Sequence, residues 1–191
     1  ASEGDLSSAL KQYRSITSDP SAASFHSFSM YGAAWCLMQQ GDFRQAHDEL
    51  QPLLNRQLQD SIGSEALLAE GVCLRNLGRS SEAVDALRRF LDRRPTGTSL
   101  ANGLYELSLA LTDLKRPLEA NVALERILAE VPDYPSTDKV LYELAWNLHE
   151  REEVSQANQQ FSLLVKHHPT SPLAAEAQYM VAQHDYDTGN Y

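Results

Sequence analysis

The chain has 191 residues, 42% of them hydrophobic, and a formal net charge of −10 at pH 7. This acidic balance argues against nucleic acid or an anionic membrane as the main partner, because phosphate binding needs clustered cations. No uncharged apolar run approaches the roughly 18 residues of a membrane span, so we expect no direct membrane insertion.

A repeat of 37 residues organises the sequence. Alanine recurs at this interval, at Ala9, Ala46, Ala83, Ala120 and Ala157. A large residue follows each alanine by four positions, at Tyr13, Leu50, Leu87, Leu124 and Phe161. A small residue precedes the last four alanines by twelve positions, at Ala34, Gly71, Ser108 and Ala145. A repeat of this length is typical of stacked units that cannot bury their apolar faces alone, and it predicts a binding scaffold.

Each repeat has the apolar spacing of two helices. Residues 104–111 (LYELSLAL) and 141–148 (LYELAWNL) place apolar side chains at i, i+3, i+4 and i+7. In chain order, the predicted helices are 5–18, 22–40, 43–57, 62–77, 80–93, 98–114, 117–130, 136–151, 154–167 and 172–188. We therefore predict an all-α fold, a right-handed α-solenoid of antiparallel helix pairs with about ten helices. The chain lacks a start Met and ends within a repeat, so we expect one repeat domain over residues 1–191 that is part of a longer protein.

Glycine and proline mark the predicted turns. Glycine is expected to take a positive φ after the first helix of a repeat, at Gly41, Gly78 and Gly189. The sequence Lys115-Arg116-Pro117 replaces it once, with Pro117 in the first turn of the next helix. Proline closes the repeats at Pro95, Pro132 and Pro169. Pro52 falls inside a predicted helix, where we expect a kink.

This pattern resembles the tetratricopeptide repeat family, a helix-turn-helix unit of 34 residues. The matching positions are Ala34, Ala46 and Leu50; Gly71, Ala83, Leu87 and Pro95; Ser108, Ala120, Leu124 and Pro132; and Ala145, Ala157, Phe161 and Pro169. The resemblance implies that the first helix of each repeat lines a concave face, with its fifth and ninth positions towards a ligand.

Those positions supply the predicted partner-binding residues, which are Tyr31, Trp35, Tyr105, Leu109, Tyr142, Trp146 and Tyr179. Rigid aromatic side chains are common anchors of binding surfaces. The alternative is that the tyrosines pack between adjacent helices and show only their hydroxyl groups. Family members that clamp a C-terminal carboxylate use Lys and Asn at these positions, and their absence here argues against such a clamp.

The segment 161–191 is similar to a narrower group, the bacterial cell-envelope repeat proteins. These include the Tol-Pal-associated periplasmic coordinator and the lipoprotein of the outer-membrane assembly machine. The resemblance implies a periplasmic or cell-envelope location rather than a cytoplasmic one. Asp185 departs from the pattern because Leu holds the equivalent earlier positions, so the last helix is expected to be a solvated cap.

The cysteines, histidines and carboxylates form no pattern typical of a disulfide, a metal site or a catalytic site. Cys36 and Cys73 lie one repeat apart, and helix-packing distance is too long for a disulfide, so we expect free buried thiols. No spacing of His, Cys or carboxylates predicts a metal site or a cofactor, and no catalytic motif is present. We therefore expect no enzyme activity. The basic cluster at Arg88, Arg89, Arg93 and Arg94 is interpreted as a solvated helix end, with an acidic-partner site as the alternative.

Three functions are compatible with these features. The first is a non-catalytic interaction scaffold of the bacterial envelope that binds a protein or peptide on its concave face. The second is a repeat domain appended to an enzyme or secretion component whose catalysis lies outside this chain. The third is end-to-end self-association through helix faces left uncovered at the chain ends.

Overall fold

The computed structural model describes residues 3–56 and 60–189, and these contain ten α-helices, one 3-10 helix and no strand. The chain divides into two compact units, Ala1–Arg94 (unit 1) and Pro95–Tyr191 (unit 2). Unit 1 holds α1 (Glu3–Ser18), η1 (Pro20–Phe25), α2 (His26–Gln39), α3 (Phe43–Asn55), α4 (Ser61–Asn76) and α5 (Ser80–Leu91). Unit 2 holds α6 (Gly97–Asp113), α7 (Pro117–Glu130), α8 (Thr137–Glu150), α9 (Val154–His167) and α10 (Ala174–Thr188).

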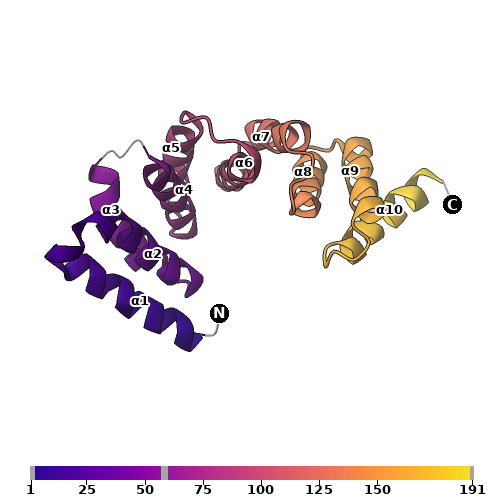
Figure 1. Ribbon diagram of the computed structural model, residues 1–191. Helices are drawn as coiled ribbons and strands as arrows, with labels where there is room; N and C mark the ends of the chain where they lie inside the picture. Colours follow the sequence, from indigo (N-terminus) through magenta and orange to yellow (C-terminus); the bar gives the residue numbers. More distant parts are fainter. Residues whose placement is uncertain (1–2, 57–59, 190–191) are drawn as a thin grey trace. The chain divides into compact units, whose positions relative to one another are not determined.

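Consecutive helices pack against each other within each unit (Figure 1). We call α2, α4, α6, α8 and α10 the A helices and α1, α3, α5, α7 and α9 the B helices. Each A helix packs on the B helix that precedes it in its own unit, and on the B helix that follows it there. This arrangement confirms the predicted all-α fold of stacked helix pairs. The prediction of one domain over residues 1–191 stays a prediction.

The helix boundaries differ from the predicted ones chiefly before α2. The helix predicted from residue 22 begins at His26, because residues 20–25 form the separate η1. Asp19 starts this 3-10 turn by accepting a hydrogen bond from the Ser21 backbone N–H at 2.9 Å. Pro52 lies inside α3, which ends at Asn55, and the predicted end at residue 57 lies outside the described residues. The kink at Pro52 stays a prediction.

The turn after each A helix is closed by a residue in the left-handed region. The described turns have φ values of 77° at Gly41, 74° at Gly78, 58° at Lys115, 63° at Glu152 and 74° at Gly189. In the first, the Gly41 N–H donates to the Met38 carbonyl at 3.0 Å and the Asp42 N–H to the Leu37 carbonyl at 2.9 Å. This is the hydrogen-bond pattern of a Schellman motif.

The sequence predicted the three glycines but not Glu152. Non-glycine residues pay a strain of about 1 kcal/mol or more in this conformation. The turn keeps its geometry at Lys115 and Glu152 because the same pair of backbone hydrogen bonds closes it. At Glu152, these are the Glu152 N–H to the His149 carbonyl at 2.9 Å and the Glu153 N–H to the Leu148 carbonyl at 3.0 Å. The turn is therefore set by the packing of the helix pair rather than by glycine alone.

The small residues of the repeat lie where an A helix crosses its following B helix. All four predicted small positions on the A helices are buried, as are the four alanines twelve residues later. Gly71 shows why size matters, because a Cβ atom there would lie 2.5 Å from Cγ of Leu87 on α5. Leu87 is itself fully buried, so it would have to shift within the core to admit this atom. The predicted small and large positions are thus buried, and Gly71 and Leu87 are in direct contact across the crossing of α4 and α5.

Gly71→Ala should lower the free energy of unfolding by about 1–3 kcal/mol, because the added methyl group overpacks the contact with Leu87. Urea unfolding followed by circular dichroism measures this change. The double variant Gly71→Ala/Leu87→Val should recover part of the loss by removing a methyl group on the opposite side. Equal stability of Gly71→Ala and the parent chain would show that α4 and α5 do not cross at this position.

Candidate functional site

The predicted binding residues are divided between the two units. Tyr31 and Trp35 lie on α2 of unit 1. The other five lie on the A helices of unit 2, with Tyr105 and Leu109 on α6, Tyr142 and Trp146 on α8, and Tyr179 on α10. The structure therefore places the predicted site on two separate A-helix faces, and each face is described on its own.

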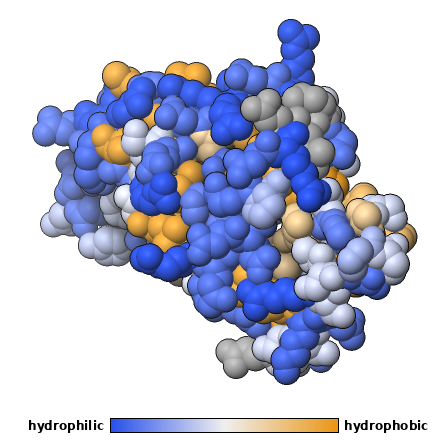
Figure 2. Space-filling model, turned by 90° about the vertical axis from the view of Figure 1, so that its left-hand side faces the viewer, coloured by the Kyte–Doolittle hydropathy of each residue, from blue (hydrophilic) through white to orange (hydrophobic). Residues whose placement is uncertain are grey.

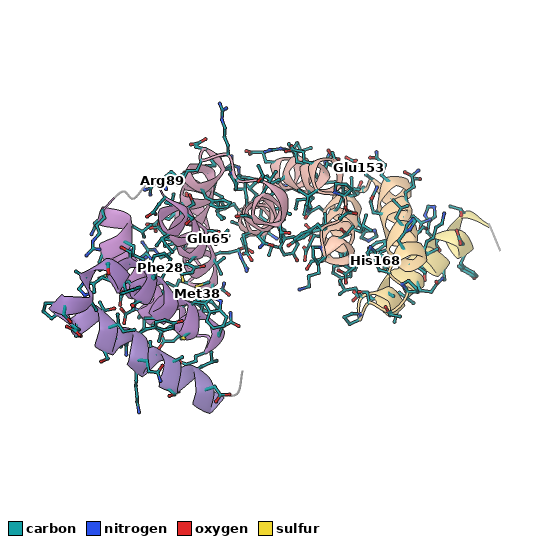
Figure 3. All side chains as sticks on the ribbon, in the orientation of Figure 1. Phe28, Met38, Glu65, Arg89, Glu153 and His168 are labelled. Atoms are coloured by element: carbon teal, nitrogen blue, oxygen red, sulfur yellow. The ribbon has the colours of Figure 1, made fainter. Side chains whose placement is uncertain are left out.

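Unit 1 presents an exposed aromatic stripe on α2. Phe28, Tyr31 and Trp35 follow each other at i, i+3 and i+7, so they share one face of the helix. Phe28 is 60% exposed and Trp35 45% exposed, while Tyr31 is half-buried. Figure 3 labels Phe28 and Met38 on α2 and Glu65 on α4. Burial and then the Glu65 carboxylate raise the pKa of Tyr31 to about 12, so its hydroxyl group stays protonated at neutral pH.

Unit 2 places its tyrosine and tryptophan in an aromatic cluster. The Trp146 ring packs edge-on against Phe161 of α9 at 5.7 Å and against Tyr142 at 6.1 Å between ring centroids. The His149 ring makes a further edge-on contact with Trp146, at 5.5 Å between ring centroids. Burial, followed by the Glu176 carboxylate of α10, raises the pKa of Tyr142. Tyr142 and Trp146 are therefore brought together, and both also serve as packing residues.

Exposed aromatic and aliphatic side chains are segregated between the two helix types. Among the described residues, the exposed aromatics lie on α2, on η1 just before it, or on α10, and they are Phe25, Phe28, Trp35, Tyr179 and Tyr186. In the same described ranges, the large exposed aliphatic side chains lie on the B helices α7 and α9, and they are Leu118, Val122, Val154 and Leu163. Figure 2 shows hydrophobic patches separated by hydrophilic residues on one side of the molecule. The segregation distinguishes the A-helix faces chemically from the B-helix faces.

Sequence reasoning missed some members of these faces. Phe28 was overlooked although its spacing to Tyr31 and Trp35 was visible in the sequence. The carboxylates beside the tyrosines were overlooked as well, although both follow their tyrosine by 34 residues, Tyr31 to Glu65 and Tyr142 to Glu176. This recurring offset was the available signal.

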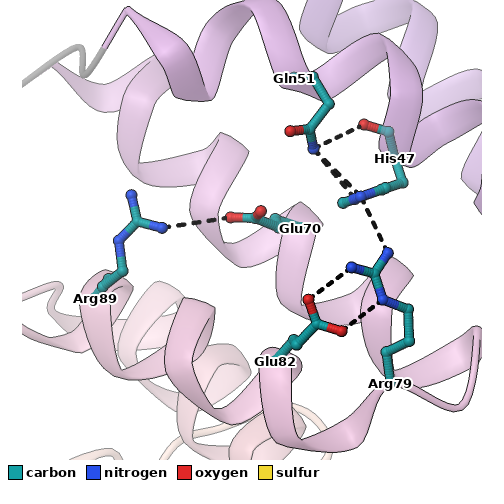
Figure 4. A network of polar contacts seen from close by, with 6 residues as sticks. All are labelled: His47, Gln51, Glu70, Arg79, Glu82 and Arg89. Carbon is teal, nitrogen blue, oxygen red and sulfur yellow. Dashed lines mark hydrogen bonds and ion pairs between the residues drawn. The ribbon is translucent and has the colours of Figure 1, made fainter.

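A polar cleft lies between α3, α4 and α5 of unit 1 (Figure 4). Arg79 forms a two-point ion pair with Glu82, at 2.7 and 2.6 Å, and its third nitrogen lies 3.4 Å from Nε2 of His47. Glu70 of α4 also lines the cleft; its side chain is 14% exposed, and its Oε2 lies 3.9 Å from Nη1 of Arg89. That buried oxygen makes no hydrogen bond to another described residue.

Glu70 occupies a position that is apolar in the other repeats. The equivalent residues are Ala33, Leu107, Leu144 and Val181. Burial raises the pKa of Glu70, while Arg89, His47 and Arg79 partly offset this effect. Its ionised form is therefore destabilised by the fold, and the departure from the repeat pattern was the sequence signal that was missed.

Glu70→Leu should raise the free energy of unfolding at pH 7, by roughly 1–4 kcal/mol, because it replaces a poorly paired buried carboxylate with the side chain found at Leu107 and Leu144. Because the pKa of Glu70 is raised in the folded state, ionisation of this carboxylate destabilises the fold. This destabilisation is absent below the unfolded-state pKa of about 4.5 and complete above the folded-state pKa. The gain should therefore shrink as the pH falls towards about 4.5 in urea-unfolding experiments. A loss of stability with an unchanged pH dependence would contradict this assignment, and Glu70→Gln separates the charge from the shape.

The predicted basic cluster is distributed around the end of α5. Arg88 and Arg89 lie in the last helical turn, where cations complement the helix dipole. Arg89 faces the carboxylate of Glu70, and Arg94 closes the following turn with a φ of 55°. Within residues 3–56 and 60–189, no group of three His, Cys, Asp or Glu side chains could hold a metal ion. No helix in this described part is long and apolar enough to cross a membrane.

Cys36 and Cys73 are free and buried, as the sequence predicted. Burial, assisted by the Glu70 carboxylate, raises the pKa of Cys73 to about 12. Iodoacetamide should therefore leave both thiols unmodified in the folded chain at pH 8 and label both in urea without a reducing agent. Mass spectrometry reads this directly. A cross-linked species that resists labelling in urea would disprove the free-thiol assignment.

Comparison with known proteins gives a sequence match and a structural match. A family model described as tetratricopeptide repeat matches residues 31–98. No curated protein matches the sequence. The fold is similar to a crystal structure of MamA protein, with a TM-score of 0.70 and 16% identity over 85% of this chain and 82% of that one.

Two further structures have the same fold. MamA 41-end from Desulfovibrio magneticus RS-1 has a TM-score of 0.67 and 18% identity over 95% of this chain and 86% of that one. YrrB, described as a TPR protein with an unusual peptide-binding site, has a TM-score of 0.65 and 18% identity over 85% and 77%. The sequence match over residues 31–98 and the fold shared with tetratricopeptide-repeat structures together support the tetratricopeptide repeat family for this chain.

Proposed function

We propose that this chain is a non-catalytic scaffold that binds a protein or peptide partner on its A-helix faces, the sides predicted to be concave. The observation that carries the proposal is the gathering of exposed aromatic side chains on α2 and α10. Aromatic rings offer large apolar area with few rotatable bonds, so a partner desolvates them at a low entropic cost. YrrB, which shares the fold, is described as having a peptide-binding site.

The two faces would contribute differently. On α2, Phe28 and Trp35 are exposed and available to a partner, and Tyr31 packs deeper. On unit 2, Tyr179 and Tyr186 provide the exposed rings, while Tyr142 and Trp146 support them through packing with Phe161. Tyr105 and Leu109 are half-buried on α6 and would line the margin of the same face.

The setting of this scaffold is proposed to be a bacterial cell-envelope assembly. The support is the similarity of residues 161–191 to envelope repeat proteins. Cell fractionation of the source organism, with an antibody against the chain, tests the location. Recovery in the cytoplasmic fraction alone would remove the envelope part of the proposal and leave the binding part unaffected.

End-to-end self-association is less well supported than partner binding. In α8, Leu141, Leu144 and Leu148 are buried. The equivalent positions of α10 are Gln178, Val181 and Asp185, and Ala177 is the buried residue of that helix. A face with two polar residues among these three favours contact with solvent over apolar stacking. Light scattering at increasing concentration tests this alternative.

The binding proposal is tested by selecting peptides from a random displayed library on the whole chain and measuring their Kd by calorimetry. Phe28→Ala/Trp35→Ala or Tyr179→Ala/Tyr186→Ala should raise the Kd about 30-fold, corresponding to a loss of about 2 kcal/mol at a hot spot. Leu118→Ala/Val122→Ala removes similarly exposed apolar area from the B helix α7 and should change the Kd less than twofold.

The thermal melt of each variant provides the control for folding. Selected peptides that lose binding only with the Leu118 and Val122 variant would move the site to the B-helix face. If the chain selects no peptide and captures no protein partner, the proposed scaffold function is refuted.

A further inference from the structure

The negative charge of the chain is concentrated in unit 2. Residues 95–191 contain 14 Asp and Glu against six Lys and Arg, a net charge of −8. Residues 1–94 contain 12 acidic and ten basic residues, a net charge of −2. Within unit 2, the A helices α6, α8 and α10 carry eight carboxylates and one Lys, so their net charge of −7 accounts for nearly all of the excess.

A carboxylate lies beside one tyrosine of the A helices in each unit. Tyr31 of α2 interacts with Glu65 of α4, and Tyr142 of α8 interacts with Glu176 of α10. In both cases, a tyrosine at the fifth position of one A helix meets a glutamate at the second position of the next. Glu143 also acts on the Tyr142 hydroxyl group. The charged groups that act on these two hydroxyls are therefore all negative.

A tyrosine ring beside a carboxylate attracts cations in two ways. The negative face of the ring draws a Lys ammonium or an Arg guanidinium that approaches within about 6 Å of its centroid. The carboxylate accepts charge-assisted hydrogen bonds from the same group. An anionic ligand is repelled by both groups, because the ring face and the carboxylate are both negative.

The surroundings of each pair fit the apolar stem of a basic side chain. Phe28 and Trp35 flank Tyr31 on α2 and are exposed. Tyr179 is exposed on α10, one helical turn beyond Glu176. Long basic side chains spread their methylene groups on apolar surface and keep the charged end near polar groups. Both faces offer this combination of aromatic surface and carboxylate.

We infer that the partner of the A-helix faces is a basic peptide segment, with a Lys or Arg side chain received by the Tyr31–Glu65 pair, by the Tyr142–Glu176 pair, or by both. The inference rests on the proposed function and names the chemistry of its ligand. Long-range attraction to the acidic unit 2 would speed the encounter with such a segment, and salt would weaken it.

The test compares two variants that remove the same amount of charge. Glu65→Gln/Glu176→Gln neutralises the carboxylates beside the tyrosines. Glu125→Gln/Asp133→Asn neutralises two exposed carboxylates on α7 and in the turn after it. The probe is the tightest-binding peptide from the random library, together with a version in which Gln replaces each Lys and Arg. Calorimetry at about 50 mM and 300 mM salt gives the Kd values.

We expect the selected peptides to be enriched in Lys and Arg. The Glu65 and Glu176 variant should raise the Kd at least tenfold at low salt, and the α7 variant less than threefold. The Gln version of the peptide should bind weakly to all forms of the chain. Equal effects of the two variants would overturn the inference, because the attraction would then be diffuse rather than local.

The experiment separates the inference from the proposal on which it rests. Selected peptides that are neutral or acidic, yet lose binding when the exposed aromatics are replaced, would refute the basic partner and retain the scaffold. Peptides whose binding depends on neither the aromatics nor the carboxylates would refute both. A melting temperature within a few degrees of the parent chain confirms that each variant is folded.

Discussion

The structure depends on the close crossing of each A helix with the B helix that follows it. At the crossing in the second repeat, Gly71 meets Leu87 with no space for even one methyl group. The same position is Ala34, Ser108 or Ala145 in the other repeats, and all are buried. Because a helix pair cannot approach closely over a larger side chain, this contact sets the interaxial distance.

The turns between the paired helices are a consequence of that crossing. A left-handed residue reverses the chain at Gly41, Gly78, Lys115 and Glu152, and two backbone hydrogen bonds close each turn. Two of these four residues are not glycine, so the packed helices hold the backbone in a conformation that it would otherwise avoid.

Helix packing also decides which side chains remain available for binding. The A helices bury one side against the B helices and leave the other with Phe28 and Trp35 in unit 1 and Tyr179 in unit 2. The same geometry brings the second position of one A helix to the fifth position of the preceding one. This produces the recurring contact of a tyrosine with a glutamate. Glu70 is a different case, since it points between helices where the other repeats are apolar, and its burial is a cost that the fold bears.

Periodicity in the sequence was sufficient to predict the helices, the small crossing positions and the buried thiols, because each follows from spacing within one repeat. The choice of the A helices as the binding side stays a prediction. Periodicity could not separate Trp35, which is exposed, from Trp146, which packs on Phe161, because both hold the ninth position. Their difference comes from contacts within the packed repeat, since Trp146 lies against Phe161 of the following helix α9 and the equivalent residue is leucine in the earlier repeats, at Leu50, Leu87 and Leu124. Tertiary packing likewise decided that Glu65 lies beside Tyr31 and Glu176 beside Tyr142. Each of these contacts joins two different helices, so it depends on how the helices stack and not on the sequence of either helix alone.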